Sequence, residues 1–302
     1  MQDEKKSNIQ SGKKSSFQRN ISRQKYRIGL VLILVSLFVG SIFLVIKHDA
    51  DSKRKAGEAY IRQFLSGRLD KEPNDLTDED FAKLTYFHMR YPSGEPFDLT
   101  LFEKFTGLQT FIFIEFLIPL NKPVVPKWKL LLAKLGIIDL EIEGYFDLKP
   151  IRKLTNLQEI HLDGLMIADI KPFAKLINLK KLTLSRTRVD DLTPIKNLIN
   201  LQELHISNSP VSNLEPVKDL INLKVLQIVS TKVSDLKPIK NLTNLEKLDI
   251  RSNPISSLEP IKGLKNLKYI DISLINNITD NQIEELREIF PSAEIIISGV
   301  RR

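Results

Sequence analysis

Apolar and polar positions recur with a period of 22 residues along the second half of the chain. Five regular repeats follow one another, and they begin at Leu154, Leu176, Leu198, Leu220 and Leu242. Residues 132–153 fit one step earlier, and Leu264 starts a further step. An internal period of this length is typical of a solenoid, in which each repeat forms one coil and stacks on its neighbours.

Fixed apolar places within each repeat predict a continuous buried interior. The first, fourth, seventh and ninth places hold Leu or Ile, and two later places are also apolar. In one repeat the expected inward residues are Leu198, Leu201, Leu204, Ile206, Val211 and Leu214. Apolar and polar residues alternate around the seventh and ninth places, which indicates a short strand buried on one face. The stacked coils are therefore expected to form a parallel sheet along one wall.

Asparagine and proline recur at the turns of the coils. We expect the third-place asparagines to bond backbone groups that are left open at the turn; they are Asn156, Asn178, Asn200, Asn222, Asn244 and Asn266. One proline per repeat is expected on the opposite wall, at Pro150, Pro172, Pro194, Pro216, Pro238 and Pro260. The fixed φ of proline suits a tight turn, and a step of 22 residues leaves room for little more than a short 3₁₀ turn there.

The open end before the repeats needs a cover, because a solenoid exposes its core at both ends. Residues 75–131 are interpreted as an N-terminal cap together with an irregular first repeat. Thr77 and Asp80 match a capping box, which predicts a helix that runs to about Met89. An irregular first repeat follows, with inward residues expected at Phe105, Leu108, Phe111 and Phe113.

The regular repeats are assigned to residues 132–278, and residues 279–302 are interpreted as a C-terminal cap. Thr279 and Gln282 are spaced as a second capping box, which predicts a helix that runs to about Ile289. A closing strand is expected at residues 294–298. Charged faces on the two cap helices would shield the ends of the stack.

The repeat pattern LxNLxxLxIxxxxVxxLxPIxx closely resembles the short, bacterial-type leucine-rich repeat of internalin-like surface proteins. The resemblance covers about residues 75–302. It implies a right-handed arc with the sheet on the concave side and protein partners bound there. The expected fold class is therefore an α/β solenoid, a leucine-rich-repeat arc with short 3₁₀ or irregular convex segments, caps at both ends and one transmembrane helix.

Two features depart from the family pattern. Asparagine is expected at the twelfth place, but only Asn253 conforms; the others are Glu143, Leu165, Thr187, Ser209 and Thr231. Hydroxyl groups should therefore replace part of the backbone ladder at that corner. Internalin-like proteins are generally fixed at or beyond their C-terminus, whereas this chain carries its apolar anchor near the N-terminus, which argues against a role in host invasion.

Residues 28–46 form an unbroken apolar run without a charged side chain. As a helix this run would rise roughly 28 Å, close to the ~30 Å of a bilayer hydrocarbon core. No small-residue cleavage motif follows, so an uncleaved transmembrane helix is favoured over a signal peptide. Residues 47–74 are interpreted as a stalk, and Tyr60, Ile61, Phe64 and Leu65 suggest a short amphipathic helix that packs on the cap.

Charge next to the apolar run predicts its direction in the membrane. The chain has a net charge of +8, and residues 1–27 carry eight cations against only Asp3 and Glu4. Four cations lie soon after the run. Because lysine and arginine favour the cytoplasmic side, we expect a disordered cytoplasmic tail at 1–27 and the repeats on the extracytoplasmic side, at the cell surface or in the periplasm. Concentration of the charge in a tail also weakens any nucleic-acid interpretation.

Catalytic and metal-binding patterns are missing from the sequence. The chain has no cysteine and four histidines, and it contains no phosphate-binding G-x-x-x-x-G-K-[ST], H-E-x-x-H or G-x-S-x-G motif. His161 and His205 fall at the same place two repeats apart, where we expect solvated surface side chains. Recurring aspartates such as Asp235 follow the repeat period. We predict no enzyme activity, no cofactor, no metal and no small-molecule substrate.

The outward sixth, eighth and tenth places form the candidate recognition surface. Exposed apolar residues on an open sheet favour a protein partner over a merely soluble face. The candidate partner-binding residues are His161, Lys181, Arg186, Arg188, Glu203, His205, Val225, Val229, Asp249, Arg251 and Tyr269. The leading hypothesis is a membrane-tethered protein–protein interaction module. The alternative is a structural or assembly component of the cell envelope that uses a broad interface, convex wall included.

Overall fold

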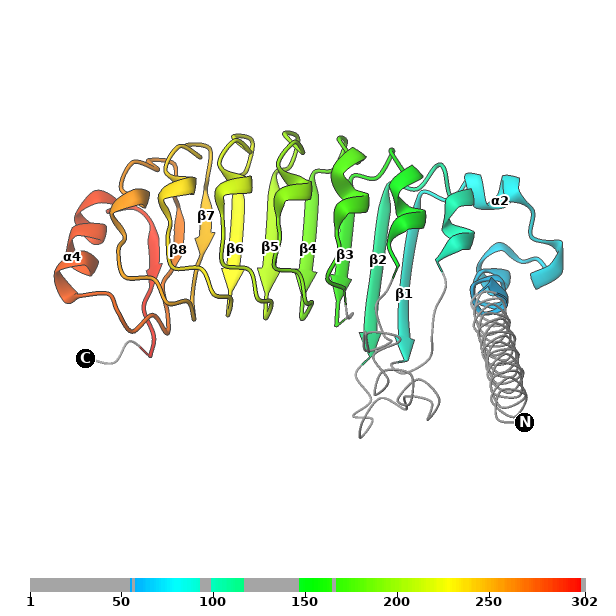
Figure 1. The fold of residues 1–302 in the computed structure, drawn as a ribbon, viewed down its shortest axis with the longest axis horizontal. Helices are drawn as coiled ribbons and strands as arrows, with labels where there is room; N and C mark the ends of the chain where they lie inside the picture. The colour runs from blue at the N-terminus through cyan, green and yellow to red at the C-terminus, as the bar shows by residue number, and fades with distance from the viewer. Residues whose placement is uncertain (1–54, 56–57, 93–98, 117–146, 165–166, 300–302) are drawn as a thin grey trace, which may run out of the picture. The chain divides into compact units, whose positions relative to one another are not determined.

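A computed structural model describes Lys55 and residues 58–92, 99–116, 147–164 and 167–299. The chain divides into Met1–Lys55 and Ala56–Arg302, and the architecture below is that of the second unit. Its strands pair in sequence order, from β1 to β9, into one parallel sheet of the described residues. In Figure 1 the strands lie side by side along one wall, and the 3₁₀ turns follow the opposite wall.

The strands and turns alternate along the chain. The strands are β1 Tyr86–Pro92, β2 Thr110–Phe116, β3 Glu159–Asp163, β4 Lys181–Ser185, β5 Glu203–Ser207, β6 Val225–Val229, β7 Lys247–Asp249, β8 Tyr269–Asp271 and β9 Glu294–Ile296. The 3₁₀ helices are η1 Pro73–Asp75, η2 Thr100–Lys104, η3 Lys149–Lys153, η4 Lys171–Lys175, η5 Thr193–Ile195, η6 Glu215–Val217, η7 Lys237–Ile239 and η8 Glu259–Ile261. The short α-helix α2, Asp78–Ala82, lies near the start and α4, Asp280–Ile289, near the end.

The 22-residue period sets the register of the sheet. Glu159 pairs with Lys181, Lys181 with Glu203, and Glu203 with Val225. Each of these partners lies one repeat further along the chain, so residues at the same place of successive repeats stand side by side. The parallel sheet and the short 3₁₀ segments predicted from the sequence are confirmed. The regular repeat expected at residues 132–153 adds no strand between its neighbours, however, because β2 pairs directly with β3.

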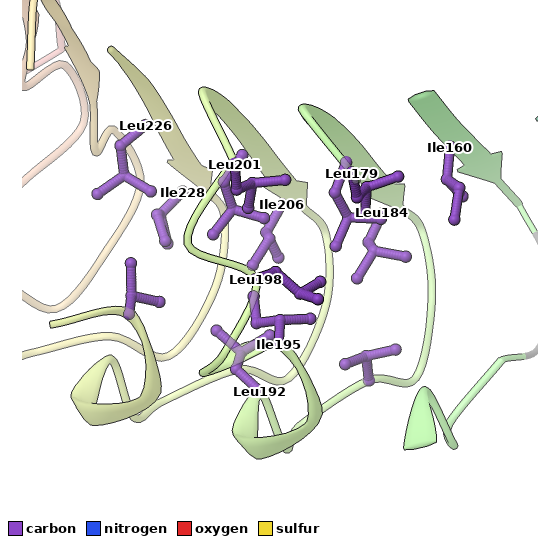
Figure 2. Packing of buried hydrophobic residues seen from close by; sticks show 14 of the residues in the cluster. Ile160, Leu179, Leu184, Leu192, Ile195, Leu198, Leu201, Ile206, Leu226 and Ile228 are labelled. Atoms are coloured by element: carbon purple, nitrogen blue, oxygen red, sulfur yellow. The ribbon is translucent and has the colours of Figure 1, made fainter. Parts of the chain in front are cut away.

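The core lies between the sheet and the 3₁₀ turns. Figure 2 shows leucine and isoleucine side chains that point from both walls into this layer. The inward residues predicted for one repeat are Leu198, Leu201, Leu204, Ile206, Val211 and Leu214, and each is at most 1 % exposed. A single coil could not bury these side chains alone, so the neighbouring coils supply most of the stabilisation.

The third-place asparagines form the predicted ladder. The side-chain amide of Asn200 donates to the carbonyl of Ile177 at 2.9 Å, and that of Asn222 donates to Ile199 at 2.8 Å. Asn156, Asn178, Asn244 and Asn266 make equivalent bonds to Thr106, Thr155, Ile221 and Thr243. Every bond reaches back to the preceding coil of the stack.

Proline and a short polar side chain together set each 3₁₀ turn. Prolines occupy the first or second residue of η3 to η8, where the missing N–H costs nothing. Two residues before each turn, a side-chain oxygen accepts a backbone N–H; Asp191 accepts from Thr193 at 2.8 Å, and Asp235 accepts from Lys237 at 2.8 Å. The recurring aspartates therefore cap turns.

A left-handed residue follows each regular strand at the eleventh place. Gly164 has φ of 79°, whereas Arg186, Asn208, Ser230, Ser252 and Leu274 have φ between 51° and 59°. This conformation is costly for residues other than glycine. A backbone bond to the next coil offsets part of that cost, as when the N–H of Arg186 donates to Ser207 at 2.8 Å. The period predicts the repeat of this turn, but only Gly164 and Asn208 signal its conformation.

The twelfth-place corner differs from the expectation that hydroxyls replace the ladder in three repeats. Thr231 Oγ1 does donate to Asn253 Oδ1, at 2.6 Å. Thr187 Oγ1 and Ser209 Oγ, however, are buried without a hydrogen-bond partner among the described residues. A hydroxyl side chain is shorter than a carboxamide. Thr187 and Ser209 therefore do not reach the carbonyls of their own coils that correspond to those bonded by Asn253. Glu143 and Leu165 lie outside the described residues.

The N-terminal end contains one helix and one strand where the sequence predicted a single long helix. Thr77 and Asp80 make the expected capping box, but α2 ends at Ala82. Tyr86–Pro92 then forms β1, in register with β2. Phe87 and Met89 are buried and alternate with outward neighbours, so the period is that of a strand and the sequence forms one more coil.

Aromatic side chains fill this end of the core. Phe105, Phe111 and Phe113 are fully buried, as predicted, together with Phe87 and Phe102. The ring centroids of Phe87 and Phe102 lie 4.8 Å apart, in an edge-on arrangement that suits their quadrupoles. These larger rings occupy a volume that leucines occupy in the regular coils, and they close the end of the stack.

Residues 58–69 are helical and pack on the N-terminal cap, as the amphipathic pattern predicted. Ile61 and Leu65 are buried, and the Phe64 ring lies 5.7 Å from that of Phe87. Tyr60 stays 43 % exposed. The guanidinium of Arg62 donates to the carbonyl of Leu76 at 2.8 Å, which ties the helix to the segment before α2.

The C-terminal cap matches its prediction. Thr279 and Gln282 form a capping box at the start of α4, which ends at Ile289. β9 closes the sheet but ends at Ile296, two residues before the expected end. In the part of the chain that the structure describes, no helix is long and apolar enough to cross a membrane. The predicted transmembrane run 28–46 and the tail 1–27 lie outside the described residues.

Candidate functional site

The side chains at the sixth, eighth and tenth places line one face of the sheet, here called the strand face. They are half-buried in the regular alternation of β3 to β6. A depression of about 470 Å³ lies in the middle of this face, over β3 to β7. Six predicted partner-binding residues line it, namely His161, Lys181, His205, Val229, Asp249 and Arg251.

A chain of hydrogen bonds crosses three strands at the depression. Lys181 Nζ of β4 lies 2.7 Å from Glu203 Oε2 of β5, and the same carboxylate oxygen lies 3.1 Å from His205 Nε2. The other ring nitrogen of His205 bonds Gln227 Oε1 of β6. Burial raises the pKa of Glu203, but the bonds from Lys181 and His205 outweigh it and lower that pKa overall. Glu203 is therefore a fixed anion that orients its neighbours.

The two histidines of the strand face are half-buried, and this corrects the expectation that they are solvated. Their side chains are 25 % exposed for His161 and 21 % exposed for His205. Burial lowers the pKa of His161, and the nearby ammonium of Lys181 lowers it further. His161 is consequently neutral at physiological pH and can donate or accept a hydrogen bond.

A second cluster lies at the end of the depression, where two carboxylates stand side by side. Asp249 of β7 and Asp271 of β8 are register partners, and they are only 2 % and 3 % exposed. The Arg251 guanidinium lies 3.5 Å from one carboxylate and 3.7 Å from the other. Burial raises the pKa of Asp249. The positive charge of Arg251 offsets part of the cost of burying the two carboxylates.

The remaining predicted residues lie beside the depression and do not line it. Arg186 makes a bidentate pair with Asp163, with both bonds at 2.8 Å. Arg188 is exposed further along the same loop. Val225 lies on β6, one outward place before Gln227. Tyr269 of β8 places its hydroxyl 3.4 Å from Asp271, and burial raises the pKa of that hydroxyl.

Gln227 and Asp271 belong to the site but were missed among the candidates chosen from the sequence. Both occupy the eighth place, which the alternating pattern directs outward, so the pattern could have found them. Their importance depends on the neighbouring strands. Gln227 bonds His205 one strand away, and Asp271 shares Arg251 with Asp249. Ser185 and Ser207 also bond each other, at 3.0 Å.

Most charges of the strand face have a partner on the protein itself. Lys181, Arg186 and Arg251 each lie within 4 Å of a carboxylate. The Lys247 ammonium lies over the Tyr269 ring, 4.6 Å from its centroid. These lateral contacts fix side chains before any partner arrives, which lowers the entropy lost on binding. Among the described residues no group of three or more His, Asp or Glu side chains could hold a metal ion. The arrangement is suited to polar recognition.

Comparison with known proteins shows which fold this is. A family model described as leucine-rich repeats, in two copies, matches residues 243–289. No curated protein matches the sequence significantly. Internalin C2 from Listeria monocytogenes is 22 % identical with a TM-score of 0.60, over 80 % of this chain and 92 % of its own.

Two further solved structures are similar to this chain in fold. An internalin, InlF, from Listeria monocytogenes is 22 % identical with a TM-score of 0.50, over 80 % of this chain and 75 % of its own. A leucine-rich-repeat protein from Leptospira interrogans is 24 % identical with a TM-score of 0.50, over 65 % of this chain and 50 % of its own. The chain thus has a leucine-rich-repeat fold with internalin-like structural neighbours, which confirms the parallel-sheet solenoid predicted from the repeats.

Proposed function

We propose that this protein is a membrane-tethered module that binds a protein partner on the concave strand face of its repeats. Proteins with the leucine-rich-repeat fold generally mediate protein–protein interaction, and they are typically non-enzymatic. The observation that carries the proposal is the depression over β3 to β7, where ion pairs and hydrogen bonds hold Lys181, His205 and Arg251 in place. Val229 supplies an apolar wall beside these polar groups.

The composition of this depression supports protein recognition in particular. Interface centres combine arginine and apolar side chains with few unpaired charges. Here the neutral His161 and the amide Gln227 offer hydrogen bonds, while the charges are already paired. A partner that matches this surface needs to desolvate few free ions, and the cost of desolvating an unpaired charge is high.

The tether and the location of the module are supported by the sequence. The apolar run 28–46 is long enough to span a bilayer, and cations outnumber acids before it. This pattern favours a cytoplasmic N-terminus and extracytoplasmic repeats. Protease treatment of intact cells tests the orientation: the repeats should be cut while a tag on the N-terminal tail survives. Loss of the tag with intact repeats would place the module in the cytoplasm.

Site-specific photocrosslinking tests the binding surface. A photoreactive amino acid at Gln227, in the full chain in intact cells, should form one defined protein adduct. The matched control carries the same group at Thr193 of η5, on the opposite wall, and should form none. Val229→Arg should abolish the Gln227 adduct without lowering the unfolding temperature by more than a few degrees. Equal adducts at Thr193 would instead support the assembly component with a broad interface.

A further inference from the structure

Three isoleucines form an exposed row on consecutive coils. Ile177, Ile199 and Ile221 occupy the second place of their repeats, and each is 56 % exposed. The fold does not demand an apolar residue there, because Thr155 and Thr243 stand at the same place in neighbouring coils. An aligned apolar row on a surface is typical of an interaction site, whereas single exposed leucines or isoleucines are ordinary.

The asparagine ladder holds this row in a fixed orientation. The backbone carbonyls of Ile177, Ile199 and Ile221 accept bonds of 2.8–2.9 Å from asparagine side chains of the following coils. The leucines on both sides of each isoleucine, such as Leu198 and Leu201 around Ile199, are fully buried. The isoleucine side chains consequently cannot turn into the core. At ~4.8 Å between neighbouring coils the row is about 10 Å long.

Lysines flank the row on both sides. Before the isoleucines the chain exposes Lys175, Lys196 and Lys218, and after them it exposes Lys180 and Lys224. Two acids lie near these lysines. Asp219 stands two residues before Ile221, and Glu215 pairs with Lys218 at 3.1 Å. The apolar row therefore has scattered lysines on both sides, with Gln202 between Lys180 and Lys224. This part of each coil is the edge where a 3₁₀ turn leads into the next strand (Figure 1).

A polar groove of about 980 Å³ runs beside the row. It is lined by the ladder asparagines and by the fifth-place side chains, which include Lys180, Lys224 and Lys268 against Glu246. Lysines in a polar groove next to an apolar line are suited to anionic groups such as phosphates. The row and the groove together can accept both parts of an amphipathic ligand surface.

We infer that the isoleucine row and its lysines dock on an anionic lipid surface. Interfacial membrane binding uses apolar side chains that enter the headgroup boundary and cations that contact anionic headgroups. The inference rests on the proposed tether in one respect. Residues 47–54 between the apolar run and Lys55 can span at most about 30 Å, so the module stays close to the membrane that anchors it.

Fluorescence from a single label tests this docking. The chain has no cysteine, so Ile199→Cys in the full chain accepts one environment-sensitive fluorophore, and Gln227→Cys on the strand face is the matched control. The full chain is reconstituted into vesicles of phosphatidylcholine alone or with about one third phosphatidylglycerol. We expect a blue-shifted, lipid-quenchable emission at position 199 only in anionic vesicles at low salt, and an unchanged emission at position 227.

Reversing the charge of two flanking lysines is the second part of the fluorescence test. Lys196→Glu together with Lys224→Glu should remove the blue shift at position 199 while the far-ultraviolet circular dichroism stays unchanged. An emission at position 199 that is equally polar in both vesicle types overturns the inference, and so does a protein adduct at position 199 in intact cells without any lipid contact. Flotation of the chain with neutral vesicles tests the tether separately, because the row predicts no affinity for neutral lipid.

Discussion

Asn253→Ala should destabilise the repeats more than its single position suggests. The Asn253 carboxamide is 5 % exposed and connects two coils. Its Nδ2 donates to the carbonyls of Ile228 and Ile250, at 2.6 Å and 2.8 Å, and its Oδ1 accepts from the N–H and the hydroxyl of Thr231. Alanine can replace none of these contacts.

The expected loss of unfolding free energy follows from the polar groups that lose their hydrogen-bond partners. The Thr231 N–H and the Ile228 carbonyl would be left buried and unbonded, and each such group costs about 1–3 kcal/mol. The unfolding free energy should therefore fall by ~3 kcal/mol. At about 3 °C per kcal/mol for a unit of this size, the unfolding temperature should fall by roughly 10 °C.

Ser209→Ala is the matched control at the same place of another repeat. Ser209 Oγ is buried without a partner among the described residues, so its removal leaves no new group unbonded. The unfolding temperature should stay within about 2 °C of the parent. Thermal unfolding of the full chain in detergent, followed by circular dichroism, compares the variants. Equal losses for the two variants, or an unchanged Asn253→Ala, would refute the reasoning from buried hydrogen bonds.

Three further predictions concern the cap, the ladder and the carboxylate pair. Thr77→Ala removes the capping box of α2 and should lower the unfolding free energy by ~1 kcal/mol in urea titration. Asn222→Ala removes the exposed bond to Ile199 and should cost about 1 kcal/mol in the same assay, less than Asn253→Ala. Burial raises the pKa of Asp249, so the folded state holds that proton more tightly than the unfolded chain and loses stability as the pH rises through the folded pKa. Asp249→Asn should thus raise the urea midpoint at pH 7 more than at pH 4, and an equal effect at both values would contradict this assignment.

The repeat interior could be predicted from the sequence because every coil meets the same neighbours. Once Leu198, Leu201 and Leu204 are assigned inward, the same places in every coil follow, and the sheet register is fixed by the period. The N-terminal coil was harder. The capping box at Thr77 favours a long helix in that segment. The segment around Phe87 forms the strand β1 instead, because it pairs with β2 and buries alternate residues.

The strand face could be predicted as a set of places but not as a set of contacts. Alternation directs His205, Gln227 and Asp249 outward, and all three lie there. The sequence does not show that Gln227 bonds His205, or that Asp249 is nearly inaccessible, because both depend on side chains one strand away. Likewise, the twelfth place predicts polar side chains, but only the length of each side chain decides which ones reach a partner.

The ladder asparagines give the stack a direction of assembly. Each one, from Asn156 to Asn266, donates to a carbonyl of the coil that precedes it, so a newly synthesised coil finds its acceptor on chain that has already left the ribosome. The N-terminal cap with its phenylalanine cluster would act as the template on which coils dock in order. Arrest of translation after several complete coils should accordingly leave a protease-resistant stack, whereas removal of the cap should delay the folding of every coil after it.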